Sequence, residues 1–267
     1  MSSSGERFTD VDLGDKRLPA CYGYITWKLL PLDQAVADLR DSLPEINEFV
    51  KFAKKHCTFP NEHMLDKDEA AAIYLYTMEM SEDKCVYRIL NQALRQQDRS
   101  KVRPWFAYLK LLNCATSKLP KVKDTVWRGI DKDVTQSFKK GQKITWWSIS
   151  SCSASVDVIS TFLGKVPHST LFNIQCSTGK SISAYTCYPS ENEVILMPGT
   201  TFKVVADPFH HQGGLHIIHL KEIAEDDDDN DNAVEQKGSM KSLTSDASAT
   251  DSTTQKLANI NLGEEKS

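Results

Sequence analysis

The period of the hydrophobic pattern changes near residue 122 of this 267-residue chain, and this change limits the fold more than any other feature. Before it, apolar residues recur at helical spacing, as in Leu32, Val36, Leu39 and Leu43. After it, turn residues separate short β-rich runs at 124–130, 143–149, 170–176, 193–197, 201–206 and 214–221. Helices followed by strands predict an α+β protein, with one more helix interrupting the strands at 154–163.

The helical half carries its own start signals. Asp66 followed by Glu69 is a capping-box pattern, which predicts that a helix begins there. Another helix is expected from about residue 82 to 94, and Pro104 suits the first turn of a further one. We therefore expect a helical N-terminal lobe over residues 1–122 and a β-rich core over residues 123–223.

The composition shifts again after residue 223. Residues 224–267 hold 11 of the 36 acidic side chains but only 4 of the 32 basic ones. The first 223 residues thus carry a net charge near +3, and the rest carry one near −7. A segment this acidic, with few aromatic residues, cannot bury enough apolar surface to offset the loss of chain entropy on folding. We therefore expect a disordered acidic tail over residues 224–267. This tail either only solvates the protein or docks on its slightly basic body.

Two carboxylates precede an apolar run that indicates a buried strand. Glu191 and Glu193 stand at its start, and the run ends at Met197. Side chains at i and i+2 of a strand project to one face, so these two acids should lie together. Adjacent like charges repel and lose hydration there unless a cation faces them. The pair is either functional or simply exposed to water at a strand edge.

An arginine and a group of hydroxyl residues lie upstream of these acids. Arg128 is embedded in a β-prone run between Trp127 and Gly129. A guanidinium in such a run needs an anionic partner, and its fork suits phosphate or carboxylate. The run 143–149 then passes into Ser150-Ser151-Cys152-Ser153, whose hydroxyls either orient a ligand or form a turn.

Taken in order, Arg128, Ser150-Ser151-Cys152 and Glu191-x-Glu193 resemble the R-S-E signature of the cholera-toxin-like mono-ADP-ribosyltransferases. The spacings, 22 residues from Arg128 to Ser150 and 43 from Ser150 to Glu193, are also similar to those of the family. The upstream helical segments resemble the lobe that precedes the core in eukaryotic members. The resemblance therefore covers roughly residues 63–223.

The resemblance implies two small sheets packed at a steep angle, with NAD bound in the cleft between them. It implies that Arg128 binds the pyrophosphate of NAD and that Gly129 lies close to the nicotinamide amide. Ser150 would orient Glu193 and the ribose. Glu193 would stabilise the positive charge that develops on the ribose when the bond to nicotinamide breaks. Phe162 would pack against the nicotinamide ring, although a core position suits it equally well.

Glu191 determines the expected substrate. In the family, an acid two residues before the catalytic glutamate accompanies arginine acceptors, because a carboxylate pairs with a guanidinium and assists its deprotonation. Tyr188 would pack on that acceptor. The resemblance thus implies an enzyme that transfers ADP-ribose from NAD to arginine side chains of target proteins and releases nicotinamide. The alternatives are an NAD glycohydrolase with the same site and a non-catalytic NAD-binding or scaffolding relative.

The remaining features concern the compartment and other ligands. Residues 1–7 have no apolar core and no run reaches the roughly 18 residues of a membrane span, so we expect an intracellular protein with no membrane partner. The seven cysteines form no C-x-x-C pair, which predicts free thiols. No metal is expected, since His216 and His219 should point to opposite faces of a strand. No basic patch indicates nucleic acid, and we expect a monomer.

Overall fold

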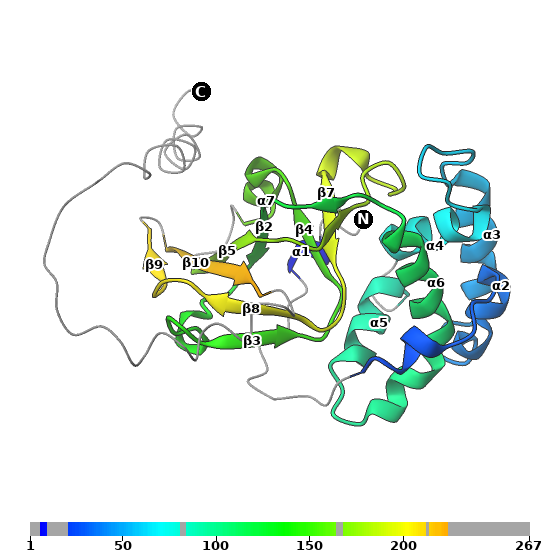
Figure 1. Ribbon diagram of the computed structural model, residues 1–267, viewed down its shortest axis with the longest axis horizontal. Coiled ribbons are helices and arrows are strands. Elements are labelled where there is room, and N and C mark those ends of the chain that lie inside the picture. Colours follow the sequence, from blue (N-terminus) through cyan, green and yellow to red (C-terminus); the bar gives the residue numbers. More distant parts are fainter. Residues whose placement is uncertain (1–5, 10–20, 81–83, 164–167, 212–213, 224–267) are drawn as a thin grey trace, which may run out of the picture. The chain divides into compact units, whose positions relative to one another are not determined.

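The computed structural model describes residues 6–9, 21–80, 84–163, 168–211 and 214–223. These residues belong to one compact unit, which ends at Ile223. The expected acidic tail, residues 224–267, lies outside the described residues. Within the compact unit, most helices that precede the strands lie on one side and the strands on the other (Figure 1).

The helical half is built from short and medium helices. Its α-helices are α1 (Glu6–Thr9), α2 (Leu32–Ala35), α3 (Ile46–His56), α4 (Lys67–Thr77), α5 (Val86–Leu94) and α6 (Phe106–Ser117). Its 3-10 helices are η1 (Gly23–Thr26), η2 (Ala37–Leu39) and η3 (Arg99–Trp105). Over the ranges that the structure describes, no helix has both the length and the apolar character that a membrane span requires.

Two of these helices differ from the expected ones. The apolar run from Leu32 to Leu43 is not one helix, because α2 ends at Ala35 and η2 follows it. Pro104 lies inside η3 rather than in α6, which begins at Phe106. Proline has no N–H to donate, so at this position it leaves the hydrogen-bond ladder of α6 intact.

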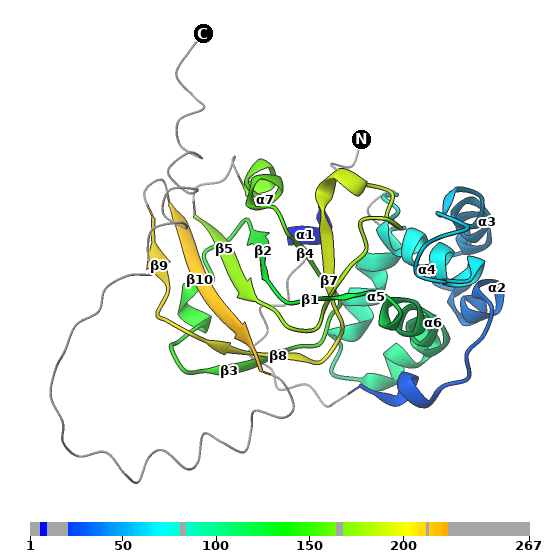
Figure 2. The same ribbon diagram turned by 45° about the horizontal axis from the view of Figure 1, so that its top comes forward.

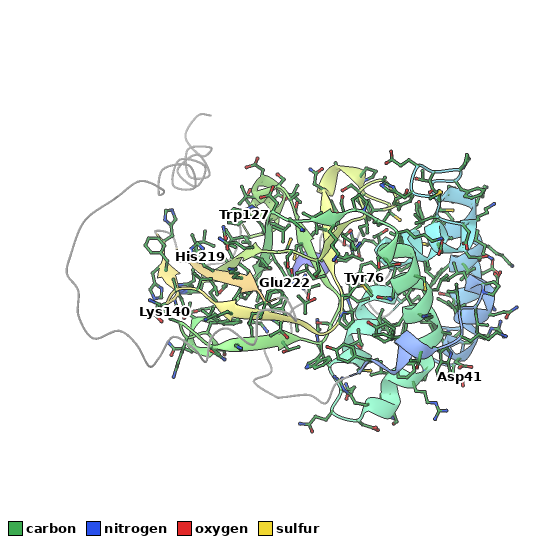
Figure 3. The ribbon with its side chains drawn as sticks, viewed as in Figure 1. Asp41, Tyr76, Trp127, Lys140, His219 and Glu222 are labelled. Carbon is green, nitrogen blue, oxygen red and sulfur yellow. The ribbon has the colours of Figure 1, made fainter. Side chains whose placement is uncertain are left out.

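Helix α4 begins as the capping box predicts. The Asp66 side chain accepts a hydrogen bond from the Glu69 N–H at 2.8 Å, and the Glu69 carboxylate accepts one from the Asp66 N–H at 2.8 Å. Helix α4 packs against α3 and α6 and is buried along most of its length. Near its end, the Tyr76 hydroxyl shares a 3.1 Å hydrogen bond with the Ser151 hydroxyl of the sheet (Figure 3 labels Tyr76). The end of α4 therefore lies against the strands.

The strands form one mixed sheet. In the described part of the chain they are β1 (Lys121–Val122), β2 (Thr125–Ile130), β3 (Lys143–Trp146), β4 (Ser150–Ser153), β5 (Ser169–Gln175), β6 (Gly179–Ser181), β7 (Glu193–Leu196), β8 (Thr200–Val204), β9 (Phe209–His210) and β10 (Leu215–Glu222). Their order is β1-β6-β7-β4-β2-β5-β10-β8-β3, with β9 paired to β10. Helix α7 (Val156–Leu163) interrupts them as expected. The α+β class is confirmed.

The expectation of two separate sheets is wrong. Strands β2 and β4 are joined by a single residue pair, Trp127 with Ser153, and this pair makes the sheet continuous (Figure 2). Strands β1, β6, β7 and β4 lie on one side of the join, and β2, β5, β10, β8 and β3 lie on the other. Arg128 follows Trp127 directly, and Glu193 is the partner of Ser153 in β7. Arg128 and Glu193 therefore belong to strands on opposite sides of the join.

The pairing of β4 with β7 places neighbouring serines on two faces. Ser151 is opposite Ile195, and Ser153 is opposite Glu193. Residues directly opposite each other in antiparallel strands project to the same face, and Ile195 belongs to the apolar core of the helical half. Because side chains alternate along a strand, Ser150 projects to the other face. Ser151, Ser153 and Glu193 thus share the face that meets the helices.

Helix α7 lies directly on β2 at Gly129. A Cβ atom at this position would stand 2.7 Å from Leu163 Cδ2 and 2.9 Å from Ile159 Cγ2. Carbon atoms do not pack that closely, so the missing side chain is what lets the helix approach the strand.

Adding that one carbon should destabilise the fold. We expect Gly129→Ala to lower the free energy of unfolding by about 1–3 kcal/mol, the usual cost of overpacking a core. Thermal unfolding should show this as a lower Tm, by about 2–4 °C per kcal/mol. Leu163→Ala in the same chain should recover part of the loss, because it removes atoms that clash. Strictly additive losses in the double variant would contradict this contact.

Candidate active site

The guanidinium of Arg7, in α1, lies at the centre of the candidate site. Its Nη2 donates to Glu191 Oε2 at 2.5 Å and to Glu193 Oε2 at 3.3 Å. Its Nε donates to Glu193 Oε1 at 3.4 Å. Its Nη1 donates to Glu79 Oε1 at 2.7 Å and to the backbone oxygen of Thr77 at 3.1 Å. Carboxylates from distant parts of the chain thus surround one cation. We call Arg7 and the residues that it hydrogen-bonds, Thr77, Glu79, Glu191 and Glu193, the Arg7 network.

Aromatic rings pack around the same guanidinium. Its carbon lies 5.3 Å from the ring centre of Tyr188 and 5.9 Å from those of Tyr87 and Phe8. These distances suit cation–π attraction. The sequence predicts that Tyr188 packs on an acceptor guanidinium, and in the structure it packs on that of Arg7.

The charges in the Arg7 network do not balance. One guanidinium faces the carboxylates of Glu79, Glu191 and Glu193, so negative charge is in excess when all three are ionised. Burial lowers the pKa of Arg7, but attraction to these three carboxylates more than offsets that effect, and the pKa lies above its ordinary value. The site is therefore well suited to hold a cation, and the planar fork of a guanidinium fits paired carboxylates.

Glu191 has an unusual carboxyl group. Burial raises its pKa, Arg7 lowers it, and the charges of Glu193 and Glu79 raise it, with a result of about 7. Its Oε1 atom is buried and has no hydrogen-bond partner among the residues described. A carboxyl group that titrates near neutral pH suits proton transfer there, and this oxygen is available to a ligand.

The two acids meet for a reason other than strand alternation. Glu191 ends the 3-10 helix η5 (Pro189–Glu191), and only Glu193 belongs to β7. Asn192 between them adopts the left-handed conformation, with φ 49° and ψ 44°, which asparagine tolerates better than most residues. The two acids do not lie along one strand, because the chain turns between them. The turn nevertheless directs both carboxylates at Arg7.

Arg128 lies in β2 and is 1% exposed. Its Nη1 donates to the backbone oxygen of Arg7 at 3.1 Å and to the backbone oxygen of Ser151. The planar fork of a guanidinium suits phosphate or carboxylate. The role of Arg128 as an anion-binding residue stays a prediction.

The structure brings Ser151, rather than Ser150, to the site. The Ser151 hydroxyl bonds to the Tyr76 hydroxyl, and the Ser151 backbone oxygen accepts from Arg128. Ser150 projects to the other face of the sheet, and its hydroxyl donates to the backbone oxygen of Ser148 at 3.5 Å. Composition cannot distinguish adjacent serines, whereas the register of β4 with β7 does so directly.

The other two predicted cofactor residues follow Arg128 along the chain. The space that a side chain would need at Gly129 is filled by Leu163 and Ile159 of α7. Packing of that helix, rather than approach to a ligand, is thus the reason that the structure gives for the glycine. Phe162 lies in α7, but its side chain is outside the part that the structure describes.

Three residues of the site are not predicted by the sequence analysis: Arg7, Glu79 and Tyr76. Glu79 is an acid two residues after the end of the buried helix α4, and an acid beside an apolar run is the same signal that marks Glu193. It could therefore have been found. Arg7 offers no such signal, since α1 has only four residues and no periodicity to show that it packs against the sheet.

The histidines form a separate group on β9 and β10. The Nδ1 atoms of His210 and His216 are 2.6 Å apart, and His219 lies further along β10. Over the described ranges, no three potential ligands are placed to hold a metal ion. The absence of a metal stays a prediction from the sequence.

The arrangement combines groups that suit one kind of chemistry. A buried guanidinium, Arg128, and a buried carboxylate, Glu193, lie on opposite sides of the sheet join. They can hold an anion and stabilise a nearby positive charge as it develops. Glu191 faces a bound guanidinium and can accept a proton from it.

Comparison with known proteins identifies a family and several relatives. Residues 32–228 match the family described as NAD:arginine ADP-ribosyltransferase. The Mav protein of Mycobacterium avium (strain 104), whose name assigns it to the NAD(+)–arginine ADP-ribosyltransferases, is 32% identical over 164 residues. This similarity covers 60% of the present chain and 18% of Mav, so the chain spans about a fifth of the length of that relative.

Solved structures share the fold at low sequence identity. The ADP-ribosyltransferase Vis of Vibrio splendidus, solved in complex with agmatine, is 18% identical with a TM-score of 0.51, over 76% of this chain and 91% of Vis. The type III effector XopAI from Xanthomonas axonopodis pv. citri is 18% identical with a TM-score of 0.55, over 76% of this chain and 92% of XopAI. Because the family match spans more than half of its residues, the chain belongs to the NAD:arginine ADP-ribosyltransferase family.

Proposed function

We propose that this protein is an arginine-specific mono-ADP-ribosyltransferase, which transfers ADP-ribose from NAD to arginine side chains of target proteins and releases nicotinamide. The observation that carries the proposal is that Glu191 and Glu193 together hold an arginine guanidinium, that of Arg7. Hydrolysis of NAD alone would need no group that binds a cation of this shape. Family membership supports NAD as the donor.

We assign Glu193 and Arg128 to the NAD side of the site. NAD supplies the glycosidic bond between nicotinamide and ribose, and breaking this bond leaves positive charge on the sugar. The Glu193 side chain is fully buried, so its charge acts through a medium of low dielectric constant and is fixed in place. The Arg128 guanidinium would hold the phosphates, in place of the backbone oxygen of Arg7.

We assign Glu191 to the acceptor and Ser151 to the orientation of Glu193. Glu191 would pair with the incoming guanidinium and take its proton as the new bond to the ribose forms. Ser151 shares the face of Glu193 and is bonded to Tyr76, which supports a positioning role for this serine instead of Ser150.

We also propose that the enzyme works in a reducing compartment. All seven cysteines are free thiols, among them the buried Cys85 and Cys152. Burial raises the pKa of the Cys152 thiol to about 12, which leaves it protonated and inert at neutral pH. Free thiols in such number are typical of reducing compartments.

The direct test uses NAD labelled in its ADP-ribose part, with agmatine as a guanidine acceptor. We expect ADP-ribosyl-agmatine and nicotinamide in equal amounts. Glu193→Gln should lower this rate by about 100-fold or more, since it removes a fixed charge beside the developing cation. Glu48→Gln, at an exposed position, is the matched control and should leave the rate unchanged. NAD consumption that is independent of agmatine would instead indicate a glycohydrolase.

Transfer should also depend on pH through Glu191. Because the pKa of Glu191 is about 7, its carboxylate form predominates only above that pH. We expect kcat/KM for agmatine to rise as the pH increases from 6 to 8, with Arg7, Glu193, Glu79 and Tyr188 as the charged or titratable groups that face it. Glu191→Gln should abolish transfer and this pH dependence while NAD hydrolysis persists. Parallel loss of transfer and hydrolysis would exclude a separate acceptor role.

The two serines provide a matched pair of variants. Ser151→Ala should lower kcat by about 10-fold or more, because Glu193 loses a positioning partner on its own face. Ser150→Ala should change kcat by less than about 2-fold, since its side chain lies on the opposite face. Both variants should be compared at saturating NAD. A larger effect at position 150 would refute the assignment to Ser151.

A further inference from the structure

The segment Glu6–Thr9, which forms α1, occupies the site described above. Helix α1 packs against β2 and β4, the two strands that the single residue pair joins (Figure 2). Arg7 and Phe8 are 1% and 0% exposed. An arginine is seldom buried this completely unless anionic partners compensate for its lost hydration.

The side chain of Arg7 takes the position of an acceptor. Its guanidinium contacts Glu191, the proposed acceptor carboxylate, at 2.5 Å and packs against Tyr188. It also donates to Glu79 and to the backbone oxygen of Thr77. Any arginine of a target protein would have to use the same groups, so Arg7 and an external acceptor exclude each other.

The backbone of Arg7 takes the position of the donor. Its carbonyl oxygen accepts from Arg128 Nη1 at 3.1 Å, and its Nε reaches Glu193 Oε1 at 3.4 Å. These are the groups assigned to the phosphates and the ribose of NAD. With the segment in place, NAD cannot bind to either group, and Arg7 therefore has no donor from which to receive ADP-ribose.

The segment does not belong to the part of the chain that the family match covers. The match begins at residue 32, whereas Arg7 precedes it by more than 20 residues. The carboxylates that it pairs with, Glu79, Glu191 and Glu193, all lie inside the match. Arg7 therefore lies outside the matched range, whereas the carboxylates that it contacts lie within it.

We propose that Glu6–Thr9 is an intramolecular competitor of both substrates, with Arg7 as an acceptor mimic that keeps the site closed until the segment leaves. This inference rests on the function proposed above and adds a regulatory state to it. The affinity for NAD is then reduced by the fraction of molecules in which the segment has left the site. If that fraction is about 1–10%, release of the segment should tighten NAD binding by about 10- to 100-fold.

The test compares NAD binding to the full chain and to its Arg7→Ala variant by titration calorimetry. We expect the Kd for NAD to fall at least 10-fold in the variant. Arg40→Ala, which removes an exposed arginine, is the matched control and should bind NAD as the unmodified chain does. Equal affinity in the unmodified chain and the folded Arg7→Ala variant would overturn the inference. Absence of NAD binding in every protein would overturn the proposed function and the inference with it.

A second variant tests the same inference in case Arg7→Ala does not fold. Arg7→Ala leaves three carboxylates without their cation, so its melting curve must be recorded alongside. Phe8→Ala keeps the cation and removes only the buried ring that anchors the segment. It should also tighten NAD binding, by a smaller factor than Arg7→Ala, and an unchanged Kd in both folded variants would refute the competitor role.

A separate peptide with the sequence of the segment should make the same contacts when it is added to the protein. The hexapeptide of residues 5–10 should inhibit the Arg7→Ala variant competitively with NAD, and the same peptide with alanine in place of the arginine should not. Mass spectrometry of the unmodified chain after incubation with NAD should find no ADP-ribose on Arg7. Failure of the arginine peptide to inhibit, or modification of Arg7 itself, would show that the segment is not a competitor.

Discussion

A cluster of buried carboxylates that needs a cation is the constraint on which the rest of the site depends. Three acids converge on Arg7: Glu79 from the segment after α4, Glu191 from the end of η5, and Glu193 from β7. Without a cation, this concentration of buried negative charge is unfavourable, and breaking one buried ion pair typically costs about 3–5 kcal/mol. The protein therefore always favours occupation of this position, by its own arginine or by that of another protein.

The sheet supplies one side of the site, and the helical half of the chain supplies the other. The sheet presents Arg128 and Glu193 to the same residue, Arg7, although 65 positions separate them in the numbering of the chain. The helical half contributes Tyr76 and Glu79 from α4 and the residues after it, and packing in its apolar core fixes them. Neither half alone contains all of these residues, so the site depends on the packing of the two halves against each other.

The sequence predicted the α+β class well, because helix and strand patterns are local signals. The capping box at Asp66 and the β-rich run around Arg128 needed only a few neighbouring residues to be recognised. The sequence alone could not determine which face Ser150 and Ser151 occupy, since a shift of one residue reverses the face of a strand and only pairing with β7 fixes it. Arg7 could not be predicted at all, because its partners are distant in the sequence and its own segment has no pattern.

The single pair between Trp127 and Ser153 has a mechanical consequence. Strands normally resist relative rotation because several hydrogen bonds hold each pair along its length. Here only one residue pair joins the two groups of strands, so the ladder itself resists a change of angle less at this join than elsewhere in the sheet. The hydrogen bond from Arg128 to the backbone oxygen of Ser151 and the packing of α1 on both strands connect the two groups at the same place. The geometry of the site therefore depends on side-chain and helix contacts across the join more than on the hydrogen bonds of the strands.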